Sequence, residues 1–155
     1  MERHLELPRC ANEEESFCDD PRDRPRVAAT PGRKRILIVD DEPLFGQTMT
    51  MLLGAEHEVV VARTGGEGLE RLLLERTFDL VLCDVSLPDI EGPALYEEVL
   101  RRDAELARRF VFVTGGAFND SAREFLCRYQ GPRLDKPFSL SALERLLESR
   151  TRLSA

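Results

Sequence analysis

Apolar runs of four or five residues alternate along this chain with segments in which apolar residues recur at helical spacing. Continuous apolar runs of this length, separated by helical patterns, are typical of parallel strands buried on both faces of a sheet. The pattern therefore predicts five strand–helix units. The expected strands are residues 35–40, 57–62, 79–83, 109–113 and 132–135. The expected helices are a segment from Pro43 up to Gly54 and residues 66–75, 93–102, 119–128 and 140–150.

Polar residues stand directly after four of the five strands. Asp40 and Asp41 follow the first run, and Asp84 follows the third. Thr114 follows the fourth run, and Lys136 follows the short fifth one. Right-handed crossovers place helices on both faces of a parallel sheet, and the carboxyl ends of its strands line the ligand crevice. We therefore expect these side chains to meet at one edge. Packing does not require three clustered carboxylates, whereas a divalent cation does.

The composition of the chain argues against several classes of protein, among them nucleic-acid-binding and membrane-spanning proteins. The chain has 155 residues, 42% of them hydrophobic, which allows one domain with a core, here residues 34–150. A formal net charge of −7 argues against nonspecific nucleic-acid binding, which needs a basic face. No apolar run approaches the roughly 20 residues of a membrane span, and no signal-peptide pattern is seen. These features predict a cytoplasmic protein that acts neither on nucleic acid nor at a membrane.

The two ends of the chain differ from its middle. Residues 1–33 are rich in Glu, Asp, Arg and Pro, and their apolar residues show no period. Such a segment buries too little to offset its ordering entropy, so we predict a disordered N-terminal tail. It could be a tether, a docking tail or a dispensable extension. Residues 151–155 are assigned to a short C-terminal tail.

The four cysteines do not form a metal-binding pattern. No two of them stand in a Cys-x-x-Cys spacing, so zinc is not expected. Cys83 lies within an apolar strand run and is interpreted as a small buried hydrophobic residue, with the thiols reduced. The cysteines are Cys10, Cys18, Cys83 and Cys127.

With these motifs in place, the chain resembles the receiver domain of response regulators in two-component signalling. The resemblance covers about residues 33–150 and rests on five motifs in the same order and spacing. It implies a flavodoxin-like, doubly wound five-stranded parallel sheet of order 2-1-3-4-5 with five helices. The motifs are Asp40-Asp41, Asp84, the segment from Pro88 to Gly92, Thr114-Gly115-Gly116 and Lys136-Pro137-Phe138.

The resemblance also implies a phosphoryl and metal site. It identifies Asp84 as the phosphoacceptor, with Mg²⁺ held by Asp41, Asp84 and the backbone carbonyl of Ser86. Asp40 would reach the cation through water. Magnesium prefers octahedral oxygen ligands with several waters retained, which suits this set. Because like charges about 4 Å apart repel by about 4 kcal/mol at an effective dielectric of 20, one carboxyl should have a raised pKa without a cation.

Two further side chains would contact the phosphoryl group. Lys136 is expected to pair with Asp84 in the resting state and with a phosphoryl oxygen afterwards. Thr114 would donate its hydroxyl to another phosphoryl oxygen. The family usually has an aromatic residue three positions before this lysine, where this chain has Arg133. In the family this aromatic ring swings inward when the Thr hydroxyl moves to the phosphoryl group. With Arg133 in its place, we expect this movement to be absent, altered or replaced by a charged signal.

The expected role is that of a stand-alone receiver, not a classical enzyme, which accepts a phosphoryl group from a histidine kinase or phosphotransfer protein. Its output would pass to an effector through the helix at 119–128, the strand at 132–135 and the helix at 140–150. Alternatives are the C-terminal receiver of a hybrid histidine kinase and a non-phosphorylated scaffold, which would function normally after Asp84→Asn. A hydrolase of the haloacid dehalogenase type would need a second Asp where this chain has Ser86.

Overall fold

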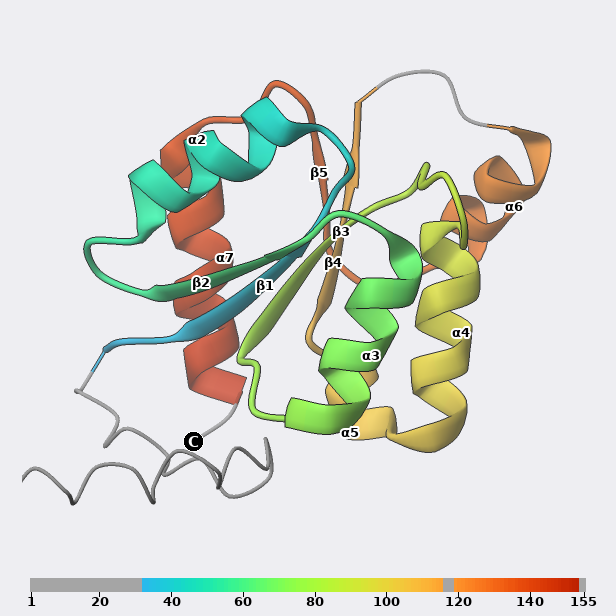
Figure 1. Cartoon of the computed structure of the whole chain (residues 1–155), viewed down its shortest axis with the longest axis horizontal. Coiled ribbons are helices and arrows are strands. Elements are labelled where there is room, and N and C mark those ends of the chain that lie inside the picture. The colour runs from blue at the N-terminus through green and yellow to red at the C-terminus, as the bar shows by residue number, and fades with distance from the viewer. Residues whose placement is uncertain (1–31, 116–118, 154–155) are drawn as a thin grey trace, which may run out of the picture.

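The computed structural model describes residues 32–115 and 119–153, and its sheet has five parallel strands in the order β2-β1-β3-β4-β5 (Figure 1). This confirms the predicted doubly wound α/β fold. The strands are β1 (Arg35–Val39), β2 (Glu58–Ala62), β3 (Leu80–Asp84), β4 (Phe110–Thr114) and β5 (Arg133–Asp135). The helices are α2 (Pro43–Leu53), α3 (Gly65–Glu75), α4 (Gly92–Arg102), α5 (Ala104–Ala107), α6 (Asp120–Arg128) and α7 (Leu140–Leu153).

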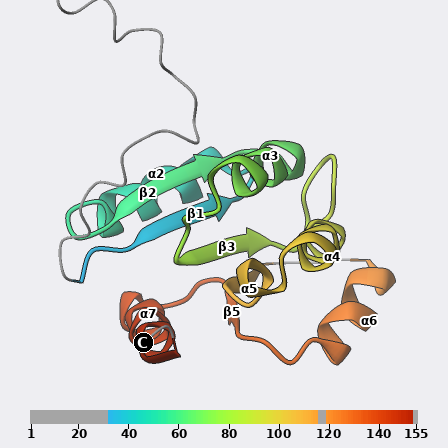
Figure 2. The ribbon, with the colours of Figure 1, turned by 90° about the horizontal axis from the view of Figure 1, so that it is seen from below.

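Helices cover both faces of the sheet. On one face, α2 and α7 pack against alternate strand residues such as Ile36 and Ile38. On the other face, α3, α4, α5 and α6 pack against the intervening residues such as Leu37 and Val39. Seen from below, α7 lies on one side of the strands, whereas α4, α5 and α6 lie on the other (Figure 2). Since both faces are covered, the central strands are fully buried, as their continuous apolar runs require.

The buried face of α2 carries only part of its apolar residues. Leu44, Met51 and Leu52 stand at helical spacing in this segment. The side of α2 that meets the sheet instead carries Met49 and Leu53, which are 3% exposed. Leu44, Met51 and Leu52 are 75%, 82% and 50% exposed. Apolar residues occur on every side of this helix. The periodicity therefore identifies a helix but not the face that it buries.

Local hydrogen bonds define the ends of the helices. The side chain of Asn119 caps the N-terminus of α6 by accepting a hydrogen bond from the backbone N–H of Ala122. The short helix α5 was not predicted. It begins where the Asp103 carboxylate accepts from the Leu106 N–H, and it buries Leu106. One helical turn is too short for a periodic pattern to reveal.

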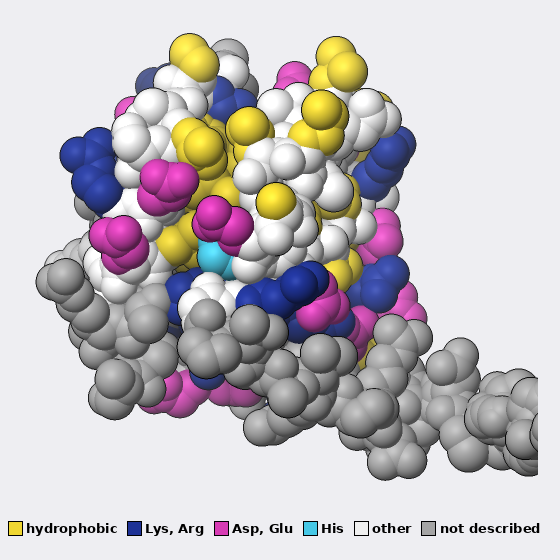
Figure 3. Space-filling view, turned by 90° about the vertical axis from the view of Figure 1, so that its left-hand side faces the viewer, with side chains coloured by type: hydrophobic (Ala, Val, Ile, Leu, Met, Phe, Trp, Pro, Cys, Tyr) yellow, Lys and Arg dark blue, Asp and Glu magenta, His cyan; other side chains and the backbone are white. Residues whose placement is uncertain are grey.

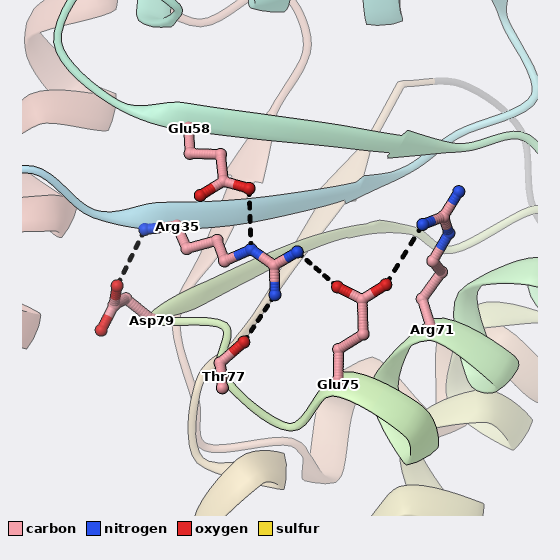
Figure 4. Close-up of polar contacts among 6 residues, drawn as sticks. All are labelled: Arg35, Glu58, Arg71, Glu75, Thr77 and Asp79. Carbon is pink, nitrogen blue, oxygen red and sulfur yellow. Dashed lines mark hydrogen bonds and ion pairs between the residues drawn. The ribbon is translucent and has the colours of Figure 1, made fainter. Parts of the chain in front are cut away.

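An arginine cluster joins the elements at the amino end of β1, the edge opposite the strand ends that carry Asp40 and Asp84. The guanidinium of Arg35 donates to Glu58 at 3.0 Å, to Thr77 at 2.5 Å and to Glu75 (Figure 4). It also lies 4.6 Å from the centre of the Phe78 ring. Burial alone would raise the pKa of Glu75, but hydrogen bonds from Arg35 and Arg71 lower it. This cluster fastens α3 and β2 to β1.

The predicted N-terminal tail falls almost entirely outside the described residues, so its disorder stays a prediction. Helix α7 continues to Leu153, into the segment assigned to the C-terminal tail. None of the helices within the described ranges is long and apolar enough to cross a membrane.

Candidate functional site

The register of the strands brings three carboxylates to the carboxyl edge of the sheet. Val39 is paired with Cys83, so Asp40 and Asp84, the next residues, end β1 and β3 at the same level. Asp41 follows at the start of the connection to α2. One ligand atom from each of Asp40, Asp41 and Asp84 lies within 4.8 Å of the others. The predicted cluster of oxygen donors is therefore formed, and its dimensions suit a hard divalent cation.

The three carboxylates have different surroundings. Asp40 is 1% exposed, and both of its oxygens already accept hydrogen bonds. Its Oδ1 accepts from the backbone N–H of Glu42 at 2.8 Å, and its Oδ2 accepts from Lys136 Nζ at 2.7 Å. Asp41 is exposed. Asp84 is partly buried, and its Oδ1 accepts from the backbone N–H of Ser86 at 3.1 Å. Asp41 and Asp84 thus keep more oxygen lone pairs available than Asp40 does.

Asp84 is the carboxyl with the raised pKa that the sequence led us to expect. Burial raises the pKa of Asp84 to about 6, and the charges of Asp40 and Asp41 act in the same direction. The Ser86 N–H and the Lys136 ammonium oppose this rise without cancelling it. Burial is the largest cause, whereas the sequence argument had relied on repulsion between the acids.

Lys136 stands over the cluster and lies closer to Asp40 than to Asp84. Its Nζ is 2.7 Å from Asp40 Oδ2, 3.7 Å from Glu42 Oε2 and 4.0 Å from Asp84 Oδ2. The expected resting pair with Asp84 is thus present only as the longest of three contacts. Burial alone would lower the pKa of Lys136, but the hydrogen bond and the charges of these acids raise it. The ammonium also lies 4.1 Å from the centre of the Phe45 ring.

The aliphatic part of Lys136 passes over Gly115. A Cβ atom on Gly115 would lie 2.6 Å from Lys136 Cδ. The absence of a side chain at Gly115 therefore makes room for the aliphatic part of Lys136. Gly116, the second glycine of that pair, lies outside the described residues. The peptide bond between Lys136 and Pro137 is cis.

Thr114 ends β4 and is 8% exposed. Its hydroxyl donates to Oδ1 of Asp135 at 2.5 Å. The structure therefore brings Thr114 to the same edge as the acid cluster, with its hydroxyl bonded to a carboxylate outside that cluster. Cys83, one residue before Asp84, is fully buried, and burial raises the pKa of its thiol well above the usual value. This agrees with its interpretation as a buried hydrophobic residue.

Side-chain hydrogen bonds attach the connection between β3 and α4 to two neighbouring helices, α3 and α6. Asp89 accepts hydrogen bonds from the backbone N–H groups of Gly65 and Gly66, both at 2.8 Å, at the beginning of α3. These bonds lower the pKa of Asp89. Glu91 accepts from the side chain of Asn119 at the N-terminus of α6. Asp89 and Glu91 thereby fix this connection to the N-terminal ends of α3 and α6.

Sequence reasoning missed four residues around the site. Glu42 and Phe45 contact the Lys136 ammonium, Asp135 accepts from Thr114, and Asp89 holds the connection after β3. Both acids could have been identified from the sequence, because Glu42 directly follows the acid pair and Asp135 is a polar residue within a strand. The ring of Phe45 looked like an ordinary helix-core residue.

An apolar groove of about 470 Å³ lies beside Lys136, between α2 and the segment that joins β5 to α7. Phe45, Met49 and Leu52 line it from α2, and Phe138 and Leu143 line it from the other side. Viewed from the side where α2 and β2 lie, the molecule shows several patches of hydrophobic side chains (Figure 3).

Comparison with known proteins identifies the family to which this fold and this cluster of side chains belong. Residues 36–148 match the model of the response regulator receiver domain. The chain belongs to this family. A crystal structure of a CheY-like receiver domain protein from Methanospirillum hungatei JF-1 is 31% identical, with a TM-score of 0.65 over 77% of this chain and 97% of that one. A receiver domain from Clostridium thermocellum, 23% identical with a TM-score of 0.67, shares the fold over 78% of this chain and 96% of its own.

Curated relatives include both regulators and kinases. The transcriptional regulatory protein CrdR of Helicobacter pylori is 30% identical over 115 residues, 72% of this chain and 52% of that protein. The sensor protein GacS of Pseudomonas syringae is 34% identical over 111 residues, 68% of this chain but 12% of that protein. The chain thus spans about half of the first relative and a small part of the second.

Proposed function

We propose that this receiver accepts a phosphoryl group on Asp84 from a phosphohistidine of a histidine kinase or phosphotransfer protein. It acts in the cytoplasm and signals by protein–protein contact. The observation that carries the proposal is the convergence of Asp40, Asp41 and Asp84 under the Lys136 ammonium. A structural salt bridge would need one acid for one lysine. A site for a cation and a phosphoryl group uses the excess of carboxylates.

The donor set fits magnesium. Asp41, Asp84 and the backbone carbonyl of Ser86 would hold the ion, and Asp40 would reach it through water. Asp40 suits that outer role because both of its oxygens already accept hydrogen bonds. When bound, Mg²⁺ supplies positive charge that offsets the charge of the phosphoryl oxygens. Because the site is acidic and contains a single lysine, it is poorly prepared for an anion without such a cation.

Phosphoryl transfer then needs positioning more than further covalent chemistry. An ionised oxygen of Asp84 attacks the phosphorus, and the bond from phosphorus to the imidazole nitrogen breaks. The electron pair of that bond stays on the ring nitrogen, which takes up a proton. Lys136 moves toward a phosphoryl oxygen, and the hydroxyl of Thr114 donates to another. The product is an acyl phosphate on Asp84.

The surroundings of the site support contact with protein partners. The apolar groove beside Lys136, between α2 and the β5–α7 segment, offers a surface to a donor protein next to the acceptor. The effector would contact α6, β5 and α7, because β5 carries the neighbour of Thr114 and connects directly to Lys136. The likeness to GacS supports a second candidate, a receiver that works with or within a hybrid kinase. Labelling of Asp84 in trans by a separate kinase would favour the first role.

The proposal is tested by incubation with acetyl phosphate and Mg²⁺, followed by intact mass spectrometry. We expect the wild type to gain the mass of one phosphoryl group only when Mg²⁺ is present. Asp84→Asn should gain none, and Glu124→Gln, which removes an exposed carboxylate on α6, should behave like the wild type. Labelling of the wild type that persists in Asp84→Asn would contradict the proposal. Normal signalling by Asp84→Asn in cells would favour the scaffold alternative.

A further inference from the structure

The hydroxyl of Thr114 is hydrogen-bonded to Asp135, a residue of the neighbouring strand β5. Thr114 and Asp135 are directly opposite each other in the parallel pair of β4 and β5. The hydroxyl donates to Asp135 Oδ1 at 2.5 Å, while the backbone N–H of Lys136 donates to the Thr114 carbonyl at 2.7 Å. Thr114 is buried and Asp135 is exposed. A hydrogen bond to an ionised acceptor is stronger than one to a neutral acceptor.

This bond competes with the function proposed for Thr114. A threonine hydroxyl has one proton, so it cannot donate to Asp135 and to a phosphoryl oxygen on Asp84 at the same time. Lys136 is in a similar position, because its shortest contact is with Asp40 and its contact with Asp84 is 4.0 Å. Both phosphoryl-binding donors therefore start out bound to carboxylates other than the acceptor.

The exposed positions of β5 that share the face of Thr114 are charged. Arg133 is paired with Phe112, and Asp135 is paired with Thr114, two residues further along both strands. Since side chains alternate between the faces of a sheet, Arg133 and Asp135 project to the same side. Both are exposed. A change in the hydrogen bonding of Asp135 would therefore alter the charge pattern next to Arg133, on the surface that we assign to the effector.

We propose that Asp135 is a positioning residue that holds the Thr114 hydroxyl away from Asp84 until a phosphoryl group competes for it. This inference rests on the proposed function of Asp84. When the Thr114 hydroxyl donates to the phosphoryl oxygen instead, the Asp135 carboxylate beside Arg133 loses this hydrogen bond. Phosphorylation at the carboxyl ends of the strands is thereby coupled to the exposed edge of β5 through one hydrogen bond.

The test is a double-mutant cycle on the rate of Asp84 phosphorylation by acetyl phosphate at subsaturating concentration. Asp135→Ala should raise the rate in the wild-type background by about tenfold, the equivalent of one hydrogen bond to a charged group. In a Thr114→Val background, which lacks the hydroxyl, the same substitution should have no such effect. Equal acceleration in both backgrounds would overturn the proposal, since it would show that only the charge of Asp135 matters.

Glu42→Gln is the charge-matched control, because Glu42 lies 3.7 Å from Lys136 Nζ but is not bonded to Thr114. Its effect should be the same with Thr114 or Val at position 114. In the unphosphorylated protein, NMR should detect an exchange-protected hydroxyl proton of Thr114 that disappears in Asp135→Ala. A wild type without this signal would overturn the inferred contact. A wild type that takes no phosphoryl group would overturn the proposed function, whereas a labelled wild type unaffected by Asp135→Ala would overturn the role of Asp135 alone.

Discussion

Replacing Asp84, the proposed phosphoacceptor, by asparagine should stabilise this domain when no metal is bound. Burial raises the pKa of Asp84 to about 6 from a reference value of 3.8. The folded state therefore binds a proton more tightly than the unfolded state does. Its stability falls as the pH rises from about 4 through 6, because ionising Asp84 costs more in the folded protein. Asp84→Asn removes that cost and retains an oxygen that can accept from the Ser86 N–H.

The size of the effect follows from the shift. A shift from 3.8 to about 6 corresponds to at most about 3 kcal/mol at neutral pH. Solvent reaches part of the carboxylate, whose side chain is 14% exposed, and screens the interaction. We therefore expect Asp84→Asn to increase the free energy of unfolding by about 1–2 kcal/mol at pH 7.5. The gain should shrink as the pH is lowered toward 4.

Urea unfolding followed by circular dichroism, in chelator at several pH values, measures this directly. Glu124→Gln is the matched control, and its free energy of unfolding should stay within about 0.5 kcal/mol of the wild type. Millimolar Mg²⁺ should stabilise the wild type more than Asp84→Asn and so reduce the difference. A variant less stable than the wild type at pH 7.5 without metal, or a gain that does not depend on pH, would refute the reasoning.

Three further predictions test other parts of the structure. Millimolar Mg²⁺ should raise the melting temperature of the unmodified wild type, and it should do so less for Asp41→Asn; equal shifts would count against Asp41 as a ligand. Phe45→Leu should slow labelling by acetyl phosphate severalfold, because it removes the ring face from the Lys136 ammonium, whereas Phe45→Tyr should retain the wild-type rate. Glu75→Gln should cost about 1–3 kcal/mol of unfolding free energy at pH 7, measured by urea titration. Since hydrogen bonds from Arg35 and Arg71 lower the pKa of Glu75 in the folded state, this cost should diminish as the pH falls below the ordinary glutamate value of 4.5, and a cost that does not depend on pH would contradict the ion pair.

Most of the fold follows from the pattern of apolar residues. Strands buried on both faces need continuous apolar runs, and β1, β3 and β4 have them, so their existence could be predicted. The order of the strands came from the family resemblance and not from the pattern. The buried face of α2 could not be predicted, because Leu44 and Met51 occupy helical positions as good as that of Met49. Helix α5 depends on the side chain of Asp103 rather than on a repeat.

The site could be predicted as a set of residues but not as a set of contacts. Strand ends in a parallel sheet must meet at one edge, and this places Asp40, Asp84 and Thr114 together. The carboxylate that lies nearest to the Lys136 ammonium depends on the path of the lysine side chain over Gly115. That path is determined by side-chain conformations in three dimensions, which spacing along the chain does not encode.

The central claim is that Asp41 and Asp84 bind one divalent cation beside the phosphoacceptor, with Asp40 in support. A crystal grown with Mn²⁺, which takes the same oxygen ligands and scatters anomalously, tests it most directly. We predict one anomalous peak within bonding distance of carboxylate oxygens of Asp41 and Asp84 and of the Ser86 carbonyl. A map at saturating Mn²⁺ that shows no peak among these three residues would contradict the account.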